Sequence, residues 1–151
     1  MGRVVYLEKG LLLGPQTLKH LVGLVNPSRY DERLAPDRFS LREVVAHMSD
    51  LEPVIRGRME LAVSNPGAPV ANWDEDAEAI AKNYAVWEVA PTLERFYDER
   101  LRTLALYESL TEEQHRLTIT HSRLGALSVY DLAVFVLGHD TYHIEQVSKY
   151  L

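Results

Sequence analysis

The segment SVYDLAVFVLGHDTYHIEQVSKY, residues 128–150, decides the fold, because it marks both the start and the inner face of a helix. Ser128 followed by Asp131 is a capping-type start, in which a short polar side chain accepts a hydrogen bond from a free amide of the first turn. The inner stripe predicted from the helical period consists of Leu132, Phe135, Val136, His139, His143, Gln146 and Tyr150. The segment therefore predicts an amphipathic helix that turns two histidines toward a core.

A second helix is predicted from Leu41 to about Val63. Ser40 and Glu43 have the spacing of a capping box, in which each side chain satisfies a free backbone amide near the other. Apolar residues share the helical face of His47, so this imidazole is also expected to point toward the core.

The rest of the chain predicts further helices and no strands. Pro15 suits the first turn of a helix, whereas Pro91 should kink or split the long helical pattern around it. The expected elements are helices at 15–25, 74–110 and from 111, and loops at 26–39 and 65–72, with an irregular stretch at 118–127. The predicted fold class is all-α, with four main helices and short extra helices in a single domain over residues 1–151.

Composition excludes several classes of protein. The 151 residues are 46% hydrophobic and 25% charged, as in an ordinary soluble domain, and a net charge of −6 argues against nucleic-acid binding. No apolar run has the length of a membrane span and no signal peptide is visible, so a cytoplasmic protein without a membrane partner is expected. The absence of cysteine excludes disulfides and thiolate ligands, so thiol chemistry would require an external thiol.

Three histidines form a candidate metal site. His139 and His143 are four residues apart, which places both imidazoles on one face of a helix, and His47 comes from another helix. Three histidine ligands leave part of the coordination sphere open, as in catalytic zinc sites. The alternative is that all three are core histidines, but burying three unpartnered imidazoles would cost about 1–3 kcal/mol each.

Neighbouring polar residues have candidate supporting roles. Gln146 lies one turn after His143, and Asp50 lies within a turn of His47, so both are candidates to orient the ligands from behind. For Asp50 the alternative is a solvated helix edge. His121 is a candidate general base, since a neutral imidazole accepts protons near neutral pH, or else a histidine of a surface loop.

Two arginines and one aromatic residue also have alternative roles. Arg58 shares the face of His47 three turns further on, and Arg100 lies in the middle of a predicted helix. Either could meet an anionic substrate, or both could be solvent-facing charges paired with nearby acids. Trp73 is expected in core or dimer packing rather than in a ligand site.

Three stretches together carry a family resemblance. They are FSLREVVAHMSDLE (39–52), LERFYDERLRTLALYESLTEEQ (93–114) and THSRLGALSVYDLAVFVLGHDTYHIEQV (120–147). The chain resembles the DinB/YfiT-like superfamily, whose pattern is one histidine in the second helix and H-x-x-x-H followed by glutamine in the last. The matching positions here are His47, His139, His143 and Gln146.

The resemblance implies an up-down-down-up four-helix bundle with a long crossover between its second and third helices. It also implies a homodimer, a small-molecule substrate and a divalent metal held by the three histidines, most often Zn or Ni, with Fe or Mn as further candidates. Better-understood relatives are transferases and isomerases that use mycothiol, bacillithiol or glutathione.

Three functions are therefore in competition. The first is a metal-dependent S-transferase that uses an external low-molecular-weight thiol, with His121 as the proton acceptor. The second is a metal-dependent hydrolase, since the same open site can lower the pKa of water to about 7. The third is a non-catalytic metal-binding scaffold in a stress response, which a fourth protein ligand would favour.

Overall fold

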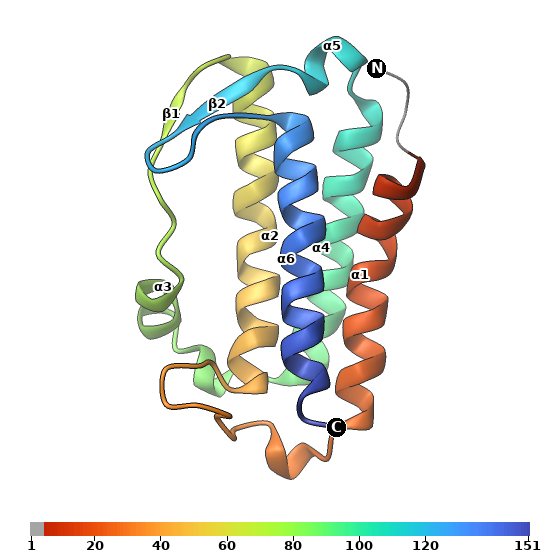
Figure 1. Ribbon diagram of the computed structural model, residues 1–151, viewed down its shortest axis with the longest axis vertical. Coiled ribbons are helices and arrows are strands. Elements are labelled where there is room, and N and C mark those ends of the chain that lie inside the picture. Colours follow the sequence, from red (N-terminus) through yellow and green to blue (C-terminus); the bar gives the residue numbers. More distant parts are fainter. Residues whose placement is uncertain (1–4) are drawn as a thin grey trace.

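Four long helices form the body of the molecule, α1 (Val5–Leu24), α2 (Leu41–Ser64), α4 (Val89–Ser109) and α6 (Val129–Ser148) (Figure 1). The computed structural model describes residues 5–151. Helices α1 and α2 each pack against both α4 and α6. Helices α2 and α4 run in one direction and α1 and α6 in the other (Figure 1). The predicted up-down-down-up four-helix bundle is confirmed.

Capping boxes start three of the helices, as the sequence indicated. Ser40 and Glu43 exchange hydrogen bonds at the start of α2, and Ser128 and Asp131 do so at the start of α6. Thr111 and Gln114 form the same motif before the short helix α5 (Glu112–His115). These starts were predictable because a cap depends only on residues within one turn.

The first helix begins ten residues earlier than predicted, with Pro15 in its interior. A proline within a helix leaves the carbonyl of the residue four positions earlier without its usual amide donor. Here that carbonyl belongs to Leu11, and Arg100 Nη1 of α4 donates to it over 2.9 Å. A partner from another helix thus satisfies the free carbonyl, which a sequence-local argument could not foresee.

The long crossover between α2 and α4 descends along the bundle (Figure 1). It contains a short strand β1 (Pro69–Val70), the helix α3 (Glu75–Ala81) and the 3₁₀ turn η2 (Tyr84–Val86). The helical pattern predicted at 74–110 is therefore split, but at residues 82–88 rather than at Pro91. Pro91 instead occupies the first turn of α4, where a missing amide costs little.

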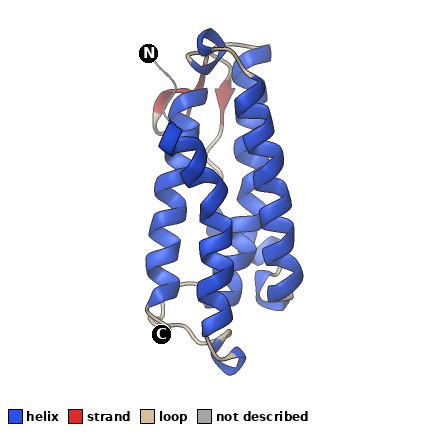
Figure 2. Ribbon diagram, turned by 90° about the vertical axis from the view of Figure 1, so that its right-hand side faces the viewer, coloured by secondary structure: helices blue, strands red, loops and turns tan. Residues whose placement is uncertain are grey.

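The prediction of no strands is wrong. Strands β2 (Thr118–His121) and β3 (Gly125–Ser128) form an antiparallel hairpin, and β1 pairs with β2 in parallel, at one end of the bundle (Figure 2). Gly125 has a φ of +76° at the end of the three-residue loop, a conformation that favours glycine. Each strand has four residues or fewer, too few for an alternating pattern to stand out in the sequence.

The apolar core is divided into two parts along the bundle. The part near the sheet includes Leu51, Ile55 and Leu132, and the part at the opposite end includes Leu18 and Val44. Buried polar residues of α2 and α6 lie between them in sequence, namely His47, Ser49, Asp50 and Glu52 on α2 and Asp140 and His143 on α6. The bundle thus carries a polar layer at mid-height, where the candidate site lies.

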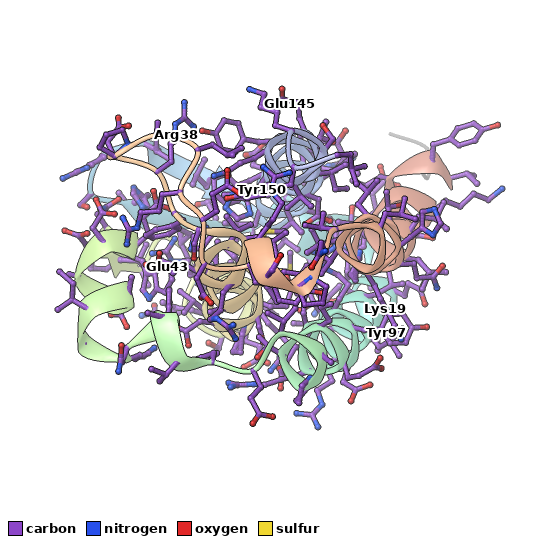
Figure 3. All side chains as sticks on the ribbon, turned by 90° about the horizontal axis from the view of Figure 1, so that it is seen from below. Lys19, Arg38, Glu43, Tyr97, Glu145 and Tyr150 are labelled. Carbon is purple, nitrogen blue, oxygen red and sulfur yellow. The ribbon has the colours of Figure 1, made fainter. Side chains whose placement is uncertain are left out.

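The loop between α1 and α2 closes the end of the bundle opposite to the sheet (Figure 3). It contains the 3₁₀ turn η1 (Pro27–Arg29). Arg29 Nη1 donates to the carbonyl of Tyr150 over 2.6 Å, and the Tyr150 hydroxyl donates to the carbonyl of Glu32 over 2.7 Å. These bonds hold the end of the chain, and hence α6, against the loop. Among the helices of residues 5–151, none combines the length and apolarity needed to cross a bilayer.

Candidate metal centre

Three imidazoles meet at mid-height between α2 and α6. His47 Nε2 lies 2.9 Å from His139 Nε2, which lies 3.1 Å from His143 Nε2. One nitrogen from each of the three residues falls within 4.8 Å of the others. The spacing of four on α6 and the inward face of α2 therefore bring together the three predicted histidines.

Gln146 fixes the protonation of one of these rings. Its Oε1 lies 2.9 Å from His143 Nδ1, and an amide oxygen can only accept, so the proton of the neutral ring is on Nδ1. His143 Nε2 is then a bare lone pair facing the other two rings. This is the orientation that a histidine needs to bind a metal through Nε2.

Burial keeps the rings neutral. It lowers the pKa of His47 to about 3 and that of His139 to about 2, and the nearby His143 lowers both further. The pKa of His143 is also lowered by burial, whereas the hydrogen bond that its Nδ1 donates to Gln146 acts to raise it. Neutral imidazoles at physiological pH are ready to accept a metal without releasing protons.

The donor set fits a divalent transition metal. The Nε2 atoms of the three neutral imidazoles face one another, and His139 Nε2 can donate a hydrogen bond to only one of its two neighbours. Hydrogen bonds among the rings therefore cannot satisfy all three nitrogens. His47 Nδ1 is a buried atom without a hydrogen-bond partner among the described residues, so the polar contacts of this ring run through Nε2, which faces His139 and Glu75. A cation at the centre would satisfy the facing lone pairs together, and imidazole suits Zn, Ni, Fe and Cu.

Glu75 is a residue of the site that the sequence analysis missed. Its Oε2 lies 3.4 Å from His47 Nε2, and 54% of its side chain is exposed. Glu75 is the first residue of α3, where the cap Asp74 positions it. Burial raises its pKa, and Asp76 and Asp74 add to the effect. Its place in an acidic helix start resembled a solvated surface, and no local signal set it apart.

Asp50 is buried but does not hydrogen-bond to His47. It accepts from the Tyr84 hydroxyl over 2.5 Å and from Lys82 Nζ over 2.8 Å, so it ties α2 to the crossover. It is therefore neither the solvated helix edge nor a direct partner of the imidazole. By anchoring the crossover, Asp50 helps to hold Glu75 over the three histidines.

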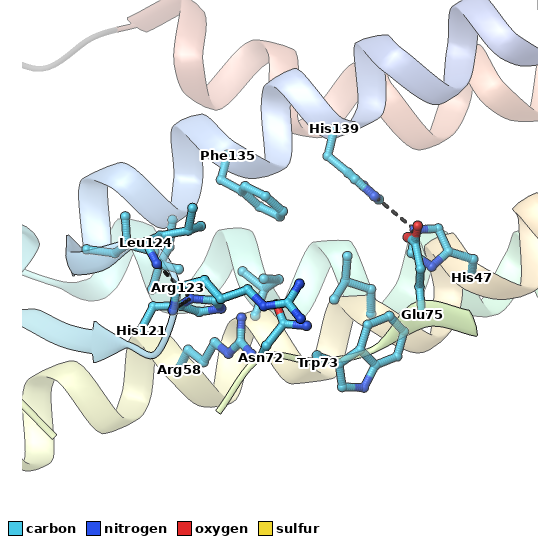
Figure 4. Close-up of a pocket in the computed structure, with 14 residues that line it drawn as sticks. His47, Arg58, Asn72, Trp73, Glu75, His121, Arg123, Leu124, Phe135 and His139 are labelled. Carbon is cyan, nitrogen blue, oxygen red and sulfur yellow. Dashed lines mark hydrogen bonds and ion pairs between the residues drawn. The ribbon is translucent and has the colours of Figure 1, made fainter. Parts of the chain in front are cut away.

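A pocket of about 320 Å³ opens beside two of the histidines (Figure 4). His47, His139 and Glu75 line one end of it, and the Trp73 ring lies tilted beside that of His47 with ring centroids 5.7 Å apart. Trp73 packs against the apolar core, as expected, and also lines this pocket, which was not expected. Phe135, predicted to face the core, lines the pocket as well and is 42% exposed.

His121 lines the same pocket from the end of β2 and is buried, not a surface loop residue. Its Nδ1 accepts the backbone amides of Arg123 and Leu124 over 3.1 and 3.2 Å. Burial lowers its pKa, helped by Arg58 and Arg123, so the ring is neutral and carries its proton on Nε2. His121 thus offers a hydrogen-bond donor where the sequence suggested a proton acceptor.

The two arginines differ in whether they reach the pocket. Arg58 lines the pocket, as the shared face with His47 suggested. Arg100 does not reach it, because it is fully buried between α4, α2 and α6 and pairs with Glu52 and Asp140. It is therefore neither a solvent-facing charge nor available to a substrate.

Comparison with known proteins places the chain in a family. Residues 11–147 match the DinB superfamily. The chain belongs to the DinB superfamily. No curated protein matches the chain.

Solved structures of DinB-type and related proteins have the same fold. YfiT from Bacillus subtilis, described as a probable metal-dependent hydrolase with an unusual four-helix bundle topology, superposes with a TM-score of 0.84 at 22% identity, covering 95% of this chain and 85% of YfiT. A mycothiol-dependent maleylpyruvate isomerase gives 0.78 at 10% identity, covering 97% and 61%. A DinB-like protein of Bacillus subtilis, YjoA, gives 0.64 at 16% identity, covering 96% and 89%. At such identities the likeness establishes the fold alone.

Proposed function

We propose that this DinB protein is a metal-dependent enzyme that activates an external thiol for transfer to a small electrophilic substrate. The observation that carries the proposal is the convergence of three neutral imidazoles, two of which line an open pocket. A divalent metal there, Zn or Ni first and Fe or Mn next, supplies a Lewis acid that lowers the pKa of an entering thiol or water.

The residues of the site have distinct roles in this proposal. His47, His139 and His143 hold the metal, and Gln146 keeps His143 in the tautomer that leaves Nε2 free. Glu75 stands 3.4 Å from His47 Nε2, on the pocket side, where a carboxylate can accept the proton that the nucleophile releases. Its position, rather than that of His121, suits the general base.

Two observations support a thiol as the nucleophile. The chain has no cysteine, so the reactive sulfur of an S-transferase must arrive with a second substrate. A structural relative is described as mycothiol-dependent. The thiolate is the nucleophilic form of a thiol, and a site that lowers the thiol pKa makes that form available at neutral pH.

Metal-dependent hydrolysis is the second candidate, and Glu75 favours it specifically. A carboxylate beside an open metal site can take a proton from water as readily as from a thiol. YfiT carries the description of a hydrolase. The two candidates differ in one property, since a hydrolase turns over without added thiol.

The deciding experiment begins with elemental analysis of protein purified without a histidine tag, beside His47→Ala and His143→Ala. We expect about one metal per chain, lost in both variants. The metal-loaded protein is then given monochlorobimane with and without glutathione, and p-nitrophenyl acetate without thiol. Thiol-dependent conjugation supports the transferase, and ester cleavage alone supports the hydrolase.

A failure of metal binding overturns both enzymatic candidates. If no metal binds after reconstitution with Zn, Ni, Mn or Fe, the histidines serve packing. If metal binds but neither activity appears, and Glu75→Gln weakens metal binding as much as a histidine variant does, Glu75 is a fourth ligand. The protein is then a metal-binding scaffold. The predicted homodimer would be tested on the same samples by light scattering.

A further inference from the structure

The pocket has a second polar end, away from the histidines. Arg58 of α2, Arg123 of the β2–β3 loop and His121 of β2 line this end (Figure 4). Glu75 is the one acidic side chain among the described lining residues, and it lies at the end with His47 and His139. The far end of the pocket is therefore positively charged, although the chain as a whole carries a net charge of −6.

Arg58 is half-buried without an acidic partner in the described part of the chain. Its Nη2 donates to the carbonyl of Ala71 over 2.9 Å. Burial lowers its pKa, and no carboxylate counteracts this. By contrast, Asp31 raises the pKa of Arg42. A partly desolvated guanidinium without a carboxylate is costly to maintain, and an anion would offset that cost.

Arg123 and His121 complete the charged end. The side chain of Arg123 makes no hydrogen bond or ion pair with the described residues, and both arginines are close enough to lower the pKa of His121. His121 itself carries its proton on Nε2 and can donate it. Two guanidinium groups and one ring N–H thus supply donors only, which is the character of an anion site.

An apolar wall separates this end from the histidines. Leu51, Ile55 and Leu132 are buried beneath the pocket, and Leu124 at its rim is 61% exposed. A substrate body that covered Leu124 and Phe135 would remove exposed apolar surface from water, at about 25 cal/mol per Å².

The spacing along α2 sets the length of that body. His47 and Arg58 are eleven residues apart, so their Cα atoms lie about 16 Å apart at roughly 1.5 Å per residue. Side chains on a helix lean toward its N-terminus, so the long side chain of Arg58 reaches back toward His47 and shortens this gap. A ligand that touches both ends must carry several carbons between its anionic group and its other end.

We propose that Arg58, Arg123 and His121 form a subsite for the carboxylate of an apolar organic acid, whose body lies along Leu51 and Ile55. The substrate class of the enzyme is then an amphipathic carboxylate whose reactive end lies at the histidines. This last step rests on the proposed function, whereas carboxylate binding at the arginines does not.

Isothermal titration with octanoate and octanamide tests the subsite directly, because the two probes differ in charge and share an apolar chain. We expect octanoate to bind more tightly than octanamide. Arg58→Gln and Arg123→Gln should each weaken octanoate binding about tenfold and leave octanamide unchanged. Arg102→Gln is the matched control, since Arg102 is an exposed arginine on α4 that pairs with Glu99.

Repeating the titration in metal-free His139→Ala separates the arginine subsite from a carboxylate bound to the metal. Octanoate binding that persists in this variant and still depends on Arg58 supports the subsite, even if the protein proves to have no metal-dependent activity. Binding that is lost in His139→Ala but unchanged in both arginine variants overturns it. Equal affinities for octanoate and octanamide also overturn it. Circular dichroism of each variant shows that it is folded.

Discussion

Two polar clusters share helices α2 and α6. They differ in whether the protein supplies a partner for every polar group of the cluster. His139 belongs to one cluster and the next residue, Asp140, to the other, because consecutive residues of a helix point about 100° apart. The Asp140 cluster contains its own counter-charges. The His139 cluster contains three facing ring nitrogens and opens onto a pocket.

The completed cluster joins all four long helices. Arg100 donates from Nε to Glu52 over 2.7 Å, from Nη1 to Asp140 over 2.6 Å and from the same nitrogen to the carbonyl of Leu11. Burial opposes the charge on Arg100, but Asp140 and Glu52 outweigh it and raise its pKa above the ordinary value. Every donor has a partner, so nothing is left for a ligand.

The difference teaches how to recognise a site in a buried polar layer. Both clusters lie within the bundle at the same level of α2 and α6, so position in the fold does not separate structure from function. The two clusters differ in whether each buried polar atom has a hydrogen-bond partner within the protein. A buried polar group without such a partner is costly, and a bound ligand relieves that cost.

Breaking the completed cluster should have the largest effect. Asp140→Ala leaves the buried Arg100 short of one carboxylate, and we expect it to lower the free energy of unfolding by about 3–5 kcal/mol. Urea denaturation of metal-free protein measures this. Asp98→Ala, at an exposed position of α4, is the control and should stay within about 0.5 kcal/mol. If Asp140→Ala lost no more stability than the Asp98→Ala control, the contrast between the clusters would be contradicted.

Breaking the incomplete cluster should cost stability only when metal is present. At a free metal concentration of about 100 times Kd, binding adds about 2.7 kcal/mol to the stability of the native protein. His139→Ala should lose this gain entirely. Thermal unfolding with and without Zn measures it, with the exposed His20→Ala as control. An equal gain in His139→Ala would place the metal elsewhere.

Glu75→Gln tests whether the open side of the histidine cluster is used. It removes the proton acceptor and keeps the shape, so kcat should fall by about a hundredfold while the metal content stays unchanged. Glu60→Gln, which alters an exposed carboxylate of α2 that does not line the pocket, should have no such effect. Activity equal to that of the native protein would remove Glu75 from the mechanism.

Gly14→Ala tests how tightly α1 packs against the completed cluster. An added Cβ would lie 2.1 Å from Asp140 Oδ2, which Arg100 holds in place, so α1 must move. We expect a loss of about 2 kcal/mol in the free energy of unfolding. At Gly23 in the same helix an added Cβ would meet no described atom within 4 Å beyond its chain neighbours and the adjacent helix backbone, so Gly23→Ala should instead stabilise by about 0.5–1 kcal/mol. Two losses of equal size would indicate a backbone effect.

Gln146→Ala should have the smallest effect. Without its carbonyl oxygen the His143 ring can adopt the other tautomer, and metal affinity should fall about tenfold. Competition with a fluorescent chelator measures the affinity, and Glu145→Ala at the neighbouring exposed position is the control. A loss as complete as that in the histidine variants would make Gln146 a ligand itself.

Sequence reasoning succeeded where one helical turn carries the information. The capping boxes at Ser40 and Ser128 and the shared face of His139 and His143 are local properties, and the family resemblance gave the bundle topology. Metal binding itself stays a prediction.

Sequence reasoning failed where the partner comes from far along the chain. Arg100 is buried because acids of two other helices meet it, and Pro15 is accommodated because Arg100 supplies a donor. Glu75 enters the site because a crossover folds back over α2. No pattern near any of these residues records its partner.

The parallel pairing of β1 with β2 has a consequence for how the protein can diversify. The backbone amides of Thr120 and Ser122 donate to the carbonyls of Ala68 and Val70. The two segments that line the pocket are therefore hydrogen-bonded into one unit. The helices that carry the histidines lie outside it. Exchanging residues 65–73 together with 118–128 between relatives should transfer ligand preference as a unit. Exchanging either segment alone should disrupt the hydrogen bonds between them.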